Sequence, residues 1–386
     1  MTTAPAALAA KMEERVMRAA HPVAYRALKS LRGPVRRVPG LGVLVNDATL
    51  LRGVLMDPEH FSKKGKGASS DLWTPILGPS LLLNMDGVDH LTLRRKLGPL
   101  FAPAYVEALA AESLASAVTD ITARLKNGER VDVVTEVRRY ASIMVSQLVG
   151  LPVEAFSDDL FARVASITRF VSLTKPRFTP RELAIAKGVL DELTANSREA
   201  YRAGGDATVP GRMRELGLTE DEALGAVGAF VIVGTETLVS YLPRLVAVLV
   251  DSGWYPHLLA DRSLIDPAIA EGLRVTTPSP VMLRSVVADA TIGNVAVRAG
   301  DRVVLATFAA NRALGPFDPS LNTAATLKQL WFGAGTHFCL GAPMAMAEIR
   351  LVVDALLAAG PIRVVSRSAS RGVMIPSYAS LVIESV

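Results

Sequence analysis

The stretch Phe332–Gly341 holds the only cysteine of the 386-residue chain, Cys339. A thiolate is a strong ligand for iron and pushes electron density onto the metal in proteins that activate oxygen. Gly333, Gly335 and Gly341 suit a tight loop around that sulfur, because glycine permits left-handed dihedrals and close approach of the backbone to a flat ligand. A lone cysteine is otherwise a small buried hydrophobic residue, but the spaced glycines and the histidine of this stretch favour the iron ligand.

The residues that follow Gly341 have a helical pattern. Pro343 fits the first turn of that helix, where its missing N–H costs nothing. The positive end of the helix dipole would then lie near the Cys339 sulfur, and backbone amides turned towards a metal-bound thiolate tune the metal. The segment therefore predicts a loop and helix that present a thiolate.

The pattern Phe-Gly-x-Gly-x-His-x-Cys-x-Gly resembles the haem-binding signature of the cytochrome P450 family, with every fixed position filled. The resemblance implies that Cys339 is the proximal ligand of haem b, iron protoporphyrin IX. It also implies that His337 pairs with a haem propionate and that Phe332 packs beside the sulfur. Gly333 and Gly341 would shape the loop under the macrocycle.

Composition limits the fold class and the cellular location that the chain can have. Half of the residues are hydrophobic and a fifth are charged, which favours a large packed core. A single cysteine excludes internal disulfides and fits a reducing, cytoplasmic location. Lys11, Glu13 and Glu14 interrupt the first apolar residues, so the start is predicted to be neither a signal peptide nor an anchor.

The most apolar stretch, Ala223–Val250, contains Glu236, Pro243 and Arg244. A membrane span requires about 20 residues with few or no charges, so this stretch is predicted to be a buried helix. The net charge of +5 indicates an acidic partner or surface. Nucleic acid is a poor candidate, because aromatic residues are only 5% of the chain and no basic cluster is visible.

The chain before residue 90 alternates between helices and short strands. Residues 1–30 predict one or two helices, and Val35–Val45 predicts two short strands around Pro39-Gly40. Asn46-Asp47 then opens a helix that ends at Met56. Residues 61–83 show no clear period and are predicted to be a long loop, a class that is often functional.

His90 and Arg94 are four positions apart and share one helix face. Taken alone, such a pair is more often a solvated face. The family resemblance implies instead that both residues bind haem propionates, with Arg284 as a third ligand of the same kind.

Helical patterns dominate residues 104–201, and residues 166–180 are predicted to connect two lid helices. A strong helix start follows at Thr219, because its side chain can cap the helix while Glu222 reaches back. The helix would run roughly 30 residues, or about 45 Å, to Val250. Only the interior of a large domain hides that much apolar helix.

Glu236 and Thr237 lie among the valines of this helix, where an ionised carboxylate is costly without a partner. The two residues can be a locally satisfied polar turn, with Thr237 bonded to a carbonyl one turn earlier. The resemblance implies more. Gly234, Glu236 and Thr237 match the glycine and the acid-threonine pair above the iron, and Glu236 and Thr237 would deliver protons.

Glu271 and Arg274 are one helical turn apart, a pair that is common on ordinary helices. Their place between the long helix and the cysteine loop matches the family's Glu-x-x-Arg pair, which implies that they fix the segment that presents Cys339. The arginine that normally completes this group is missing, because no arginine occurs between Arg312 and Arg350. Ala324 falls near its expected place.

Residues 292–304 predict a hairpin around Ala299-Gly300-Asp301, and residues 363–383 predict a terminal hairpin whose tip, Met374-Ile375-Pro376, returns to the pocket. By family geometry the pocket is lined by apolar side chains that favour an apolar organic substrate. These are Trp73, Ile76, Leu82, Phe230, Val233, Val281, Met282 and Ile375.

We therefore predict a mainly α protein with the cytochrome P450 fold, in one domain over residues 1–386. Its small β-rich lobe would comprise approximately residues 30–60, 275–305 and 361–386. The implied reaction is monooxygenation by dioxygen, with electrons from a ferredoxin-type donor and its NAD(P)H-dependent reductase. A peroxide-driven or oxygen-independent haem enzyme remains an alternative, as does a non-catalytic haem sensor or carrier.

Overall fold

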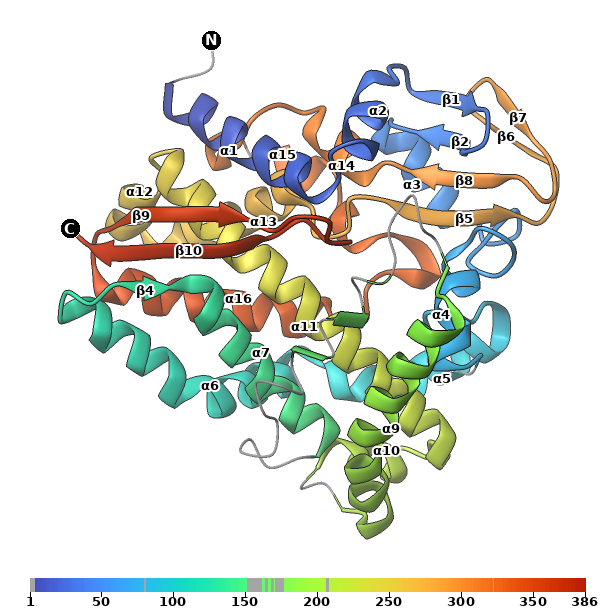
Figure 1. Ribbon diagram of the computed structural model, residues 1–386, viewed down its shortest axis with the longest axis horizontal. Coiled ribbons are helices and arrows are strands. Elements are labelled where there is room, and N and C mark those ends of the chain that lie inside the picture. The colour runs from blue at the N-terminus through green and yellow to red at the C-terminus, as the bar shows by residue number, and fades with distance from the viewer. Residues whose placement is uncertain are drawn as a thin grey trace.

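The computed structural model describes residues 4–79, 81–150, 162–163, 166–167, 170, 177–205, 208–321 and 323–386. Within these residues the fold is mainly helical, with small sheets at two places (Figure 1). The helices are α1 Ala4–Ala20, α2 Ala24–Ser30, α3 Ala48–Met56, α4 Ser69–Leu77, α5 Gly87–Leu97, α6 Pro103–Lys126, α7 Val133–Val149, α9 Pro180–Ala203, α10 Val209–Glu215, α11 Glu220–Asp251, α12 Tyr255–Ala260, α13 Ile265–Thr276, α14 Thr307–Arg312, α15 Thr323–Thr326 and α16 Ala342–Ala359. The strands are β1 Val35–Val38, β2 Gly42–Val45, β3 Phe61–Ser62, β4 Val131–Asp132, β5 Met282–Val286, β6 Ala290–Ile292, β7 Val295–Val297, β8 Arg302–Leu305, β9 Ile362–Ala369 and β10 Tyr378–Ser385.

The larger sheet has the strand order β1-β2-β8-β5-β3 and lies at one end of the molecule (Figure 1). The predicted hairpin around Gly300 is wrong in its pairing. Strand β7 pairs with β6 across a turn at Gly293, whereas β8 pairs with β5 and β2. The Gly300 turn is real, but its N–H donates to the Val286 carbonyl at 2.8 Å and so ties β8 to the end of β5.

The terminal hairpin forms as predicted, with β9 paired to β10. Its position differs from the predicted lobe, because β10 also pairs with β4 in a separate three-stranded sheet. That sheet packs on α7 and α1, on the opposite side of the molecule from β1 and β2 (Figure 1). Residues 361–386 are therefore not part of the sheet that contains β1, β2, β5 and β8.

Residues 61–83 are not the predicted loop, since they contain β3 and α4. Helix α4 has no side-chain cap and carries Pro75 inside it, so its local signals are weak. Its buried residues recur at helical spacing, and burial of that face stabilises the helix. The predicted connector at residues 166–180 lies mostly outside the described residues.

The central helix α11 begins and ends almost where the sequence predicts. Its capping box is complete, since the Glu222 N–H donates to Thr219 Oγ1 at 3.2 Å and the Thr219 N–H donates to Glu222 Oε2 at 2.8 Å. Thirty-two residues then cross the middle of the fold (Figure 1). The capping box and the apolar run are both local signals, which is why the prediction is confirmed.

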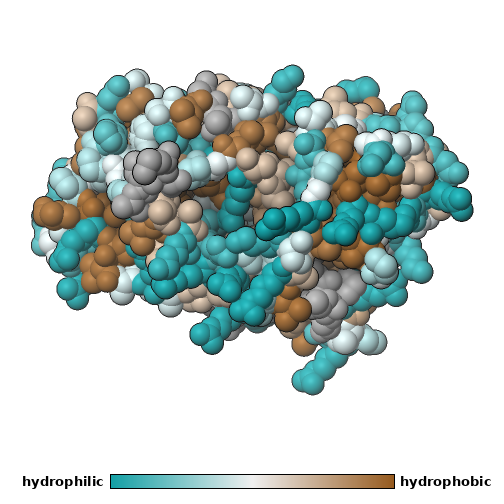
Figure 2. Space-filling view, turned by 90° about the horizontal axis from the view of Figure 1, so that it is seen from above, coloured by the Kyte–Doolittle hydropathy of each residue, from teal (hydrophilic) through white to brown (hydrophobic). Residues whose placement is uncertain are grey.

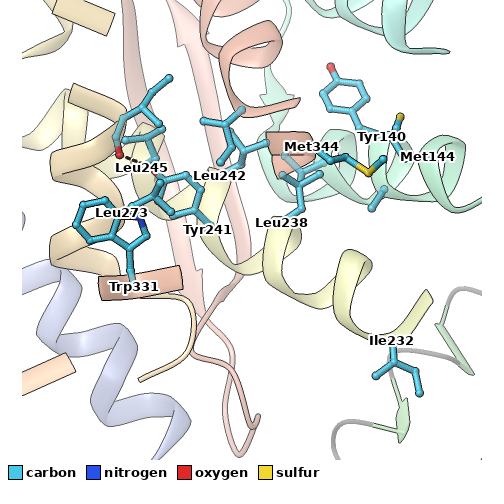
Figure 3. Close-up of a cluster of buried hydrophobic side chains, with 14 of the residues drawn as sticks. Tyr140, Met144, Ile232, Leu238, Tyr241, Leu242, Leu245, Leu273, Trp331 and Met344 are labelled. Atoms are coloured by element: carbon cyan, nitrogen blue, oxygen red, sulfur yellow. Dashed lines mark hydrogen bonds between the residues drawn. The ribbon is translucent and has the colours of Figure 1, made fainter. Parts of the chain in front are cut away.

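Side chains of α11 form the centre of the core (Figure 3). Leu245 lies towards Leu273 of α13, whereas Leu238 lies towards Met344 of α16. Helices α11 and α13 pack closely at Gly272, where an added Cβ would lie 2.4 Å from Leu245 Cδ1. A side chain at this position would force the side chains of Leu245 and Tyr241 to move, so glycine lets the two helices approach closely.

Helix α11 is also the one described helix that is long and apolar enough to cross a membrane, by length and composition alone. Its most apolar window is 59% buried inside the fold, which fits the core helix predicted from its sequence. On the face seen in Figure 2, hydrophobic residues lie between hydrophilic ones and form no single continuous area.

Candidate active site

The Cys339 loop is closed by short backbone hydrogen bonds. The Cys339 N–H donates to the Phe332 carbonyl at 2.9 Å, and the Phe338 N–H donates to the Gly335 carbonyl at 3.0 Å. Gly333 and Gly335 both have positive φ. A Cβ on Gly335 would lie 2.7 Å from the Leu55 carbonyl oxygen, so this turn of the loop has no room for a side chain.

The Cys339 sulfur faces the amino end of α16. Burial raises the pKa of the thiol, while the backbone N–H groups of Gly341 and Ala342, hydrogen-bonded to the sulfur, lower it. A Cβ on Gly341 would lie 4.0 Å from the sulfur and 3.9 Å from Phe101. This is the arrangement of amides that a metal-bound thiolate requires.

A cavity of about 960 Å³ lies above this loop, and nearly all of the predicted site residues line it. They come from α4, α5, α11, β5, the Cys339 loop and the tip of the terminal hairpin. The predicted residues on its wall are Trp73, Leu82, His90, Arg94, Phe230, Val233, Gly234, Glu236, Thr237, Val281, Met282, Arg284, Phe332, Gly333, His337, Cys339, Gly341 and Ile375.

Ile76 is the exception among the predicted pocket residues. It is buried in the hydrophobic core but is not on the cavity wall. Leu72, Trp73 and Leu77 present the cavity face of α4 instead. Ile76 therefore lies in the expected segment but on a different face of α4 from the cavity. The sequence predicted a loop here, so helix faces could not be assigned from it.

Two predicted propionate ligands lie side by side. The rings of His90 and His337 have centroids 4.2 Å apart. His337 Nε2 is hydrogen-bonded to the Asp86 carboxylate, which leaves His337 Nδ1 buried without a hydrogen-bond partner. Burial lowers the pKa of both histidines to about 4, more than the Asp86 contact raises that of His337.

Asp86 was not predicted as a site residue. Besides His337, its carboxylate accepts hydrogen bonds from the Ser62 hydroxyl and from the Lys63 N–H at 2.8 Å. Burial raises the pKa of Asp86, but these hydrogen bonds outweigh it and hold the pKa well below its ordinary value. From sequence, Asp86 looks like a helix cap before α5, yet its side chain makes no capping hydrogen bond.

The buried and half-buried side chains described on this side of the cavity include the cations Arg284, Arg94 and Lys63 but only one carboxylate that acts on them, Asp86. Arg284 is 3% exposed, donates to the Leu283 carbonyl at 2.8 Å, and has its pKa lowered to about 10 by burial. Burial lowers the pKa of Arg94 as well. Lys63, which sequence reasoning also missed, lines the same wall. Asp86 is the carboxylate that acts electrostatically on Lys63 and Arg284.

The residues present fit haem. A buried imidazole nitrogen without a partner and an excess of buried cations favour a ligand with negatively charged oxygens, because buried charges require pairing. The glycine loop beneath the cysteine leaves the sulfur open to a flat ligand. The rest of the wall is mostly apolar, as a hydrocarbon ring system requires.

Another part of the cavity wall is formed by α11. Thr237 Oγ1 donates to the Val233 carbonyl at 2.8 Å, which confirms the bond predicted to a carbonyl one turn earlier. An added Cβ at Gly234 would have no heavy atom within 4 Å beyond its own helix backbone, so the helix is open to the cavity there. Glu236 also lines the cavity.

The Glu271–Arg274 pair is buried and bidentate, with Arg274 Nε 2.8 Å from Glu271 Oε2. The expected third arginine is replaced by backbone. Arg274 donates to the carbonyls of Asn311 at 2.7 Å and Pro316 at 2.9 Å, and the Asp318 N–H donates to Glu271 Oε1 at 3.0 Å. Ala324 is a buried apolar residue. The pair is thus satisfied without the missing side chain.

A mainly helical fold around a large cavity, with a cysteine sulfur in a loop of backbone amides and several basic side chains on the same cavity wall, is the arrangement expected of haem-thiolate proteins. Comparison with known proteins agrees. The family model described as "Cytochrome P450" matches residues 257–359. Cytochrome P450 107B1 of Saccharopolyspora erythraea is 30% identical over 74% of this chain and 71% of its own. Mycinamicin IV hydroxylase/epoxidase of Micromonospora griseorubida is 27% identical over 72% of this chain and 71% of its own.

Solved structures show the same fold. P450BioI, solved with a hexadec-9Z-enoic acid ligated acyl carrier protein, superposes with a TM-score of 0.80 at 19% identity, over 96% of this chain and 99% of that one. CYP109B1 from Bacillus subtilis superposes with a TM-score of 0.76 at 22% identity, over 95% of this chain and 100% of that one. The chain belongs to the cytochrome P450 family and is a monooxygenase-family enzyme.

Proposed function

We propose that the protein is a haem-thiolate monooxygenase that inserts one oxygen atom from dioxygen into an apolar organic substrate. The observation that carries this proposal is the Cys339 loop, with its amides directed at a sulfur on the wall of a large cavity. A ferredoxin-type donor, its NAD(P)H-dependent reductase and a cytoplasmic location belong to the same proposal. Haem b, when bound, supplies the redox and oxygen chemistry.

The side chains of this chain would divide the remaining tasks. Cys339 would hold the iron of the haem, and His90, Arg94, Arg284 and His337 would hold its two carboxylates. A propionate can pair with His337 Nδ1 only if that nitrogen carries a proton, so binding would favour the imidazolium between Asp86 and the propionate.

The α11 wall would position protons and exclude water. The Thr237 hydroxyl already donates its proton to the Val233 carbonyl, which leaves its oxygen lone pairs as acceptors towards the cavity. Glu236, one position earlier on the same wall, supplies a carboxyl that exchanges protons with water. Phe230 and Val233 cover the adjacent cavity surface and keep it apolar.

Carbon monoxide binding to the reduced protein tests the thiolate assignment. The parent should show the absorption band that gives the family its name, because that band reports an iron-bound thiolate. Cys339→Ala should lose this band, and Cys339→His should bind carbon monoxide with a band of the imidazole-ligated type. A Cys339→Ala variant that keeps the parent band would overturn the assignment.

The source of oxidising equivalents decides between the proposal and its nearest alternative. The parent is assayed with an excess of ferredoxin, reductase and NADPH, and separately with hydrogen peroxide alone. Product formed only with the electron donors supports the monooxygenase. Product formed only with peroxide favours a peroxide-driven enzyme on the same fold.

A further inference from the structure

Lys63 has a firmly held backbone and a side chain on the cavity wall. Its N–H donates to Asp86 Oδ2 at 2.8 Å, and its carbonyl accepts from the Ser70 N–H at 3.1 Å. The residue is thus fixed at both of its peptide groups, one towards Asp86 and one towards the start of α4. Its neighbour Lys64 is exposed and does not line the cavity.

The ammonium group of Lys63 has no counter-charge of its own. In the described part of the chain no carboxylate accepts a hydrogen bond from Lys63 Nζ. Asp86, the carboxylate that acts electrostatically on Lys63, is already engaged by His337 Nε2, the Ser62 hydroxyl and two backbone N–H groups. Burial, followed by the positive charge of Arg284, lowers the pKa of Lys63 to about 7.

Lys63 lies near the residues that are proposed to bind the haem propionates. The charged groups that act on its ammonium are Arg284, Asp86, Cys339 and Arg94, which come from β5, the turn before α5, the cysteine loop and α5 itself. Two of these, Arg94 and Arg284, belong to the proposed propionate clamp. The positive charges of Arg94 and Arg284 both disfavour the ammonium form of Lys63 unless negative charge arrives with the ligand.

We propose that Lys63 binds a carboxylate of the haem, as a further cation beside His90, Arg94, Arg284 and His337. This inference rests on the proposed function, because it requires haem in the cavity. A lysine suits the task as a compact point charge on a flexible stem. Asp86 then acts as a positioning residue, since it holds both the Lys63 backbone and the His337 ring.

The experiment measures how fast haem leaves the protein for an excess of apomyoglobin, followed by the Soret absorption. The ferric holoproteins of the parent, Lys63→Met, Lys63→Arg and Lys64→Met are each loaded with haem and, separately, with haem dimethyl ester. The ester has the same ring and iron but carries no carboxylate charge. Methionine keeps the length and apolar body of lysine and removes only the charge.

Lys63→Met should release haem roughly tenfold faster than the parent, as the loss of one charge-assisted hydrogen bond predicts. Both should release the dimethyl ester at the same rate, because the ester offers no charge to bind. Lys63→Arg should lie close to the parent with haem, and Lys64→Met should match the parent with both ligands.

Two results would overturn the proposal. Equal haem release from Lys63→Met and the parent would show that Lys63 binds no carboxylate. Equally faster release of haem and ester from Lys63→Met would show a packing role without charge recognition. If the parent did not bind the iron of either ligand through Cys339, the proposed function would fail instead. The carbon monoxide spectrum of the reduced parent identifies that outcome, because it reports whether a thiolate binds the iron.

Discussion

The Thr237 hydroxyl is where a structural and a catalytic role can be separated at the scale of one residue. Its bond to the Val233 carbonyl satisfies the donor, and on that ground alone Thr237 could be a local helix feature. Its place on the cavity wall, beside the open Gly234 position, supports the catalytic role instead. The two roles predict different consequences when only the oxygen is removed.

Thr237→Val should bind haem and substrate normally yet divert reducing equivalents to hydrogen peroxide, because valine fills the same volume without an acceptor for a proton donor. The assay compares NAD(P)H consumed, product formed and peroxide released with a reconstituted donor. Thr237→Ser, which keeps the hydroxyl, is the matched control and should stay closer to the parent. Unchanged coupling in a well-folded Thr237→Val would remove Thr237 from the mechanism.

Individual site residues were predictable where one short motif contains them. Cys339, His337 and Gly341 fall within one pattern, and His90 and Arg94 fall on one helix turn. Asp86 could not be found this way, because its contact with His337 joins positions 251 apart. Lys63 was hidden as well, since Lys63 and Lys64 look alike in sequence and differ only in which one faces the cavity.

At the scale of elements, helix α16 carries a buried acid whose charge state bears on the stability of the fold. Glu348 is 6% exposed and lines the cavity, and burial raises its pKa from 4.5 to about 8. Between these values the folded protein retains a proton that the unfolded chain has released. Stability is therefore expected to fall as the pH rises from about 4.5 to about 8.

Glu348→Gln should remove this pH dependence and raise the free energy of unfolding at pH values above about 8, by an amount on the order of a few kcal/mol. Urea unfolding of the parent and of Glu348→Gln at a series of pH values measures the free energy of unfolding. Asp354→Asn, on the same helix with a side chain 47% exposed, is the control and should follow the parent. The idea fails if the parent and Glu348→Gln show the same pH profile.

Elements were predictable where local signals agreed with burial. The capping box of Thr219 and Glu222 and the long apolar run defined α11 from sequence alone. Helix α4 was missed because Pro75 opposes a helix locally and no side chain caps its start, while burial of Trp73 and Leu77 stabilises it only in the folded protein. The wrong hairpin partner for β8 has the same origin, since strand pairing depends on contacts distant in sequence.

At the scale of the whole molecule, a buried charge cluster joins the amino-terminal helix to the pocket. Glu13 of α1 pairs with Arg244 of α11 and with Arg312 of α14 at 2.7 Å. Arg244 Nη1 also donates to the Pro376 carbonyl at 3.1 Å, next to Ile375 on the cavity wall. The cluster thus connects both ends of the chain to the central helix.

The tip of the terminal hairpin is held from two further sides. Ser240 of α11 donates to the Pro376 carbonyl at 2.6 Å, and His21 Nε2 lies 2.9 Å from the Met374 carbonyl oxygen. His21 and Met374 both line the cavity. The hairpin tip on the cavity wall is therefore held by the residue that directly follows α1, through a contact that joins positions 353 apart and leaves no local signal in the sequence.

Glu13→Gln is expected to destabilise the protein by roughly 3 kcal/mol or more, because it leaves Arg244, which is fully buried, without its neutralising charge. Glu14→Gln is the matched control. Glu14 lies on the surface with Lys29, so its loss should cost less than about 1 kcal/mol. Urea unfolding of both variants measures the difference.

Because the same cluster holds Pro376, Glu13→Gln should also weaken the binding of apolar ligands that shift the haem spectrum, whereas Glu14→Gln should not. Equal stability of the two variants would show that the buried cluster is not what couples α1 to the pocket.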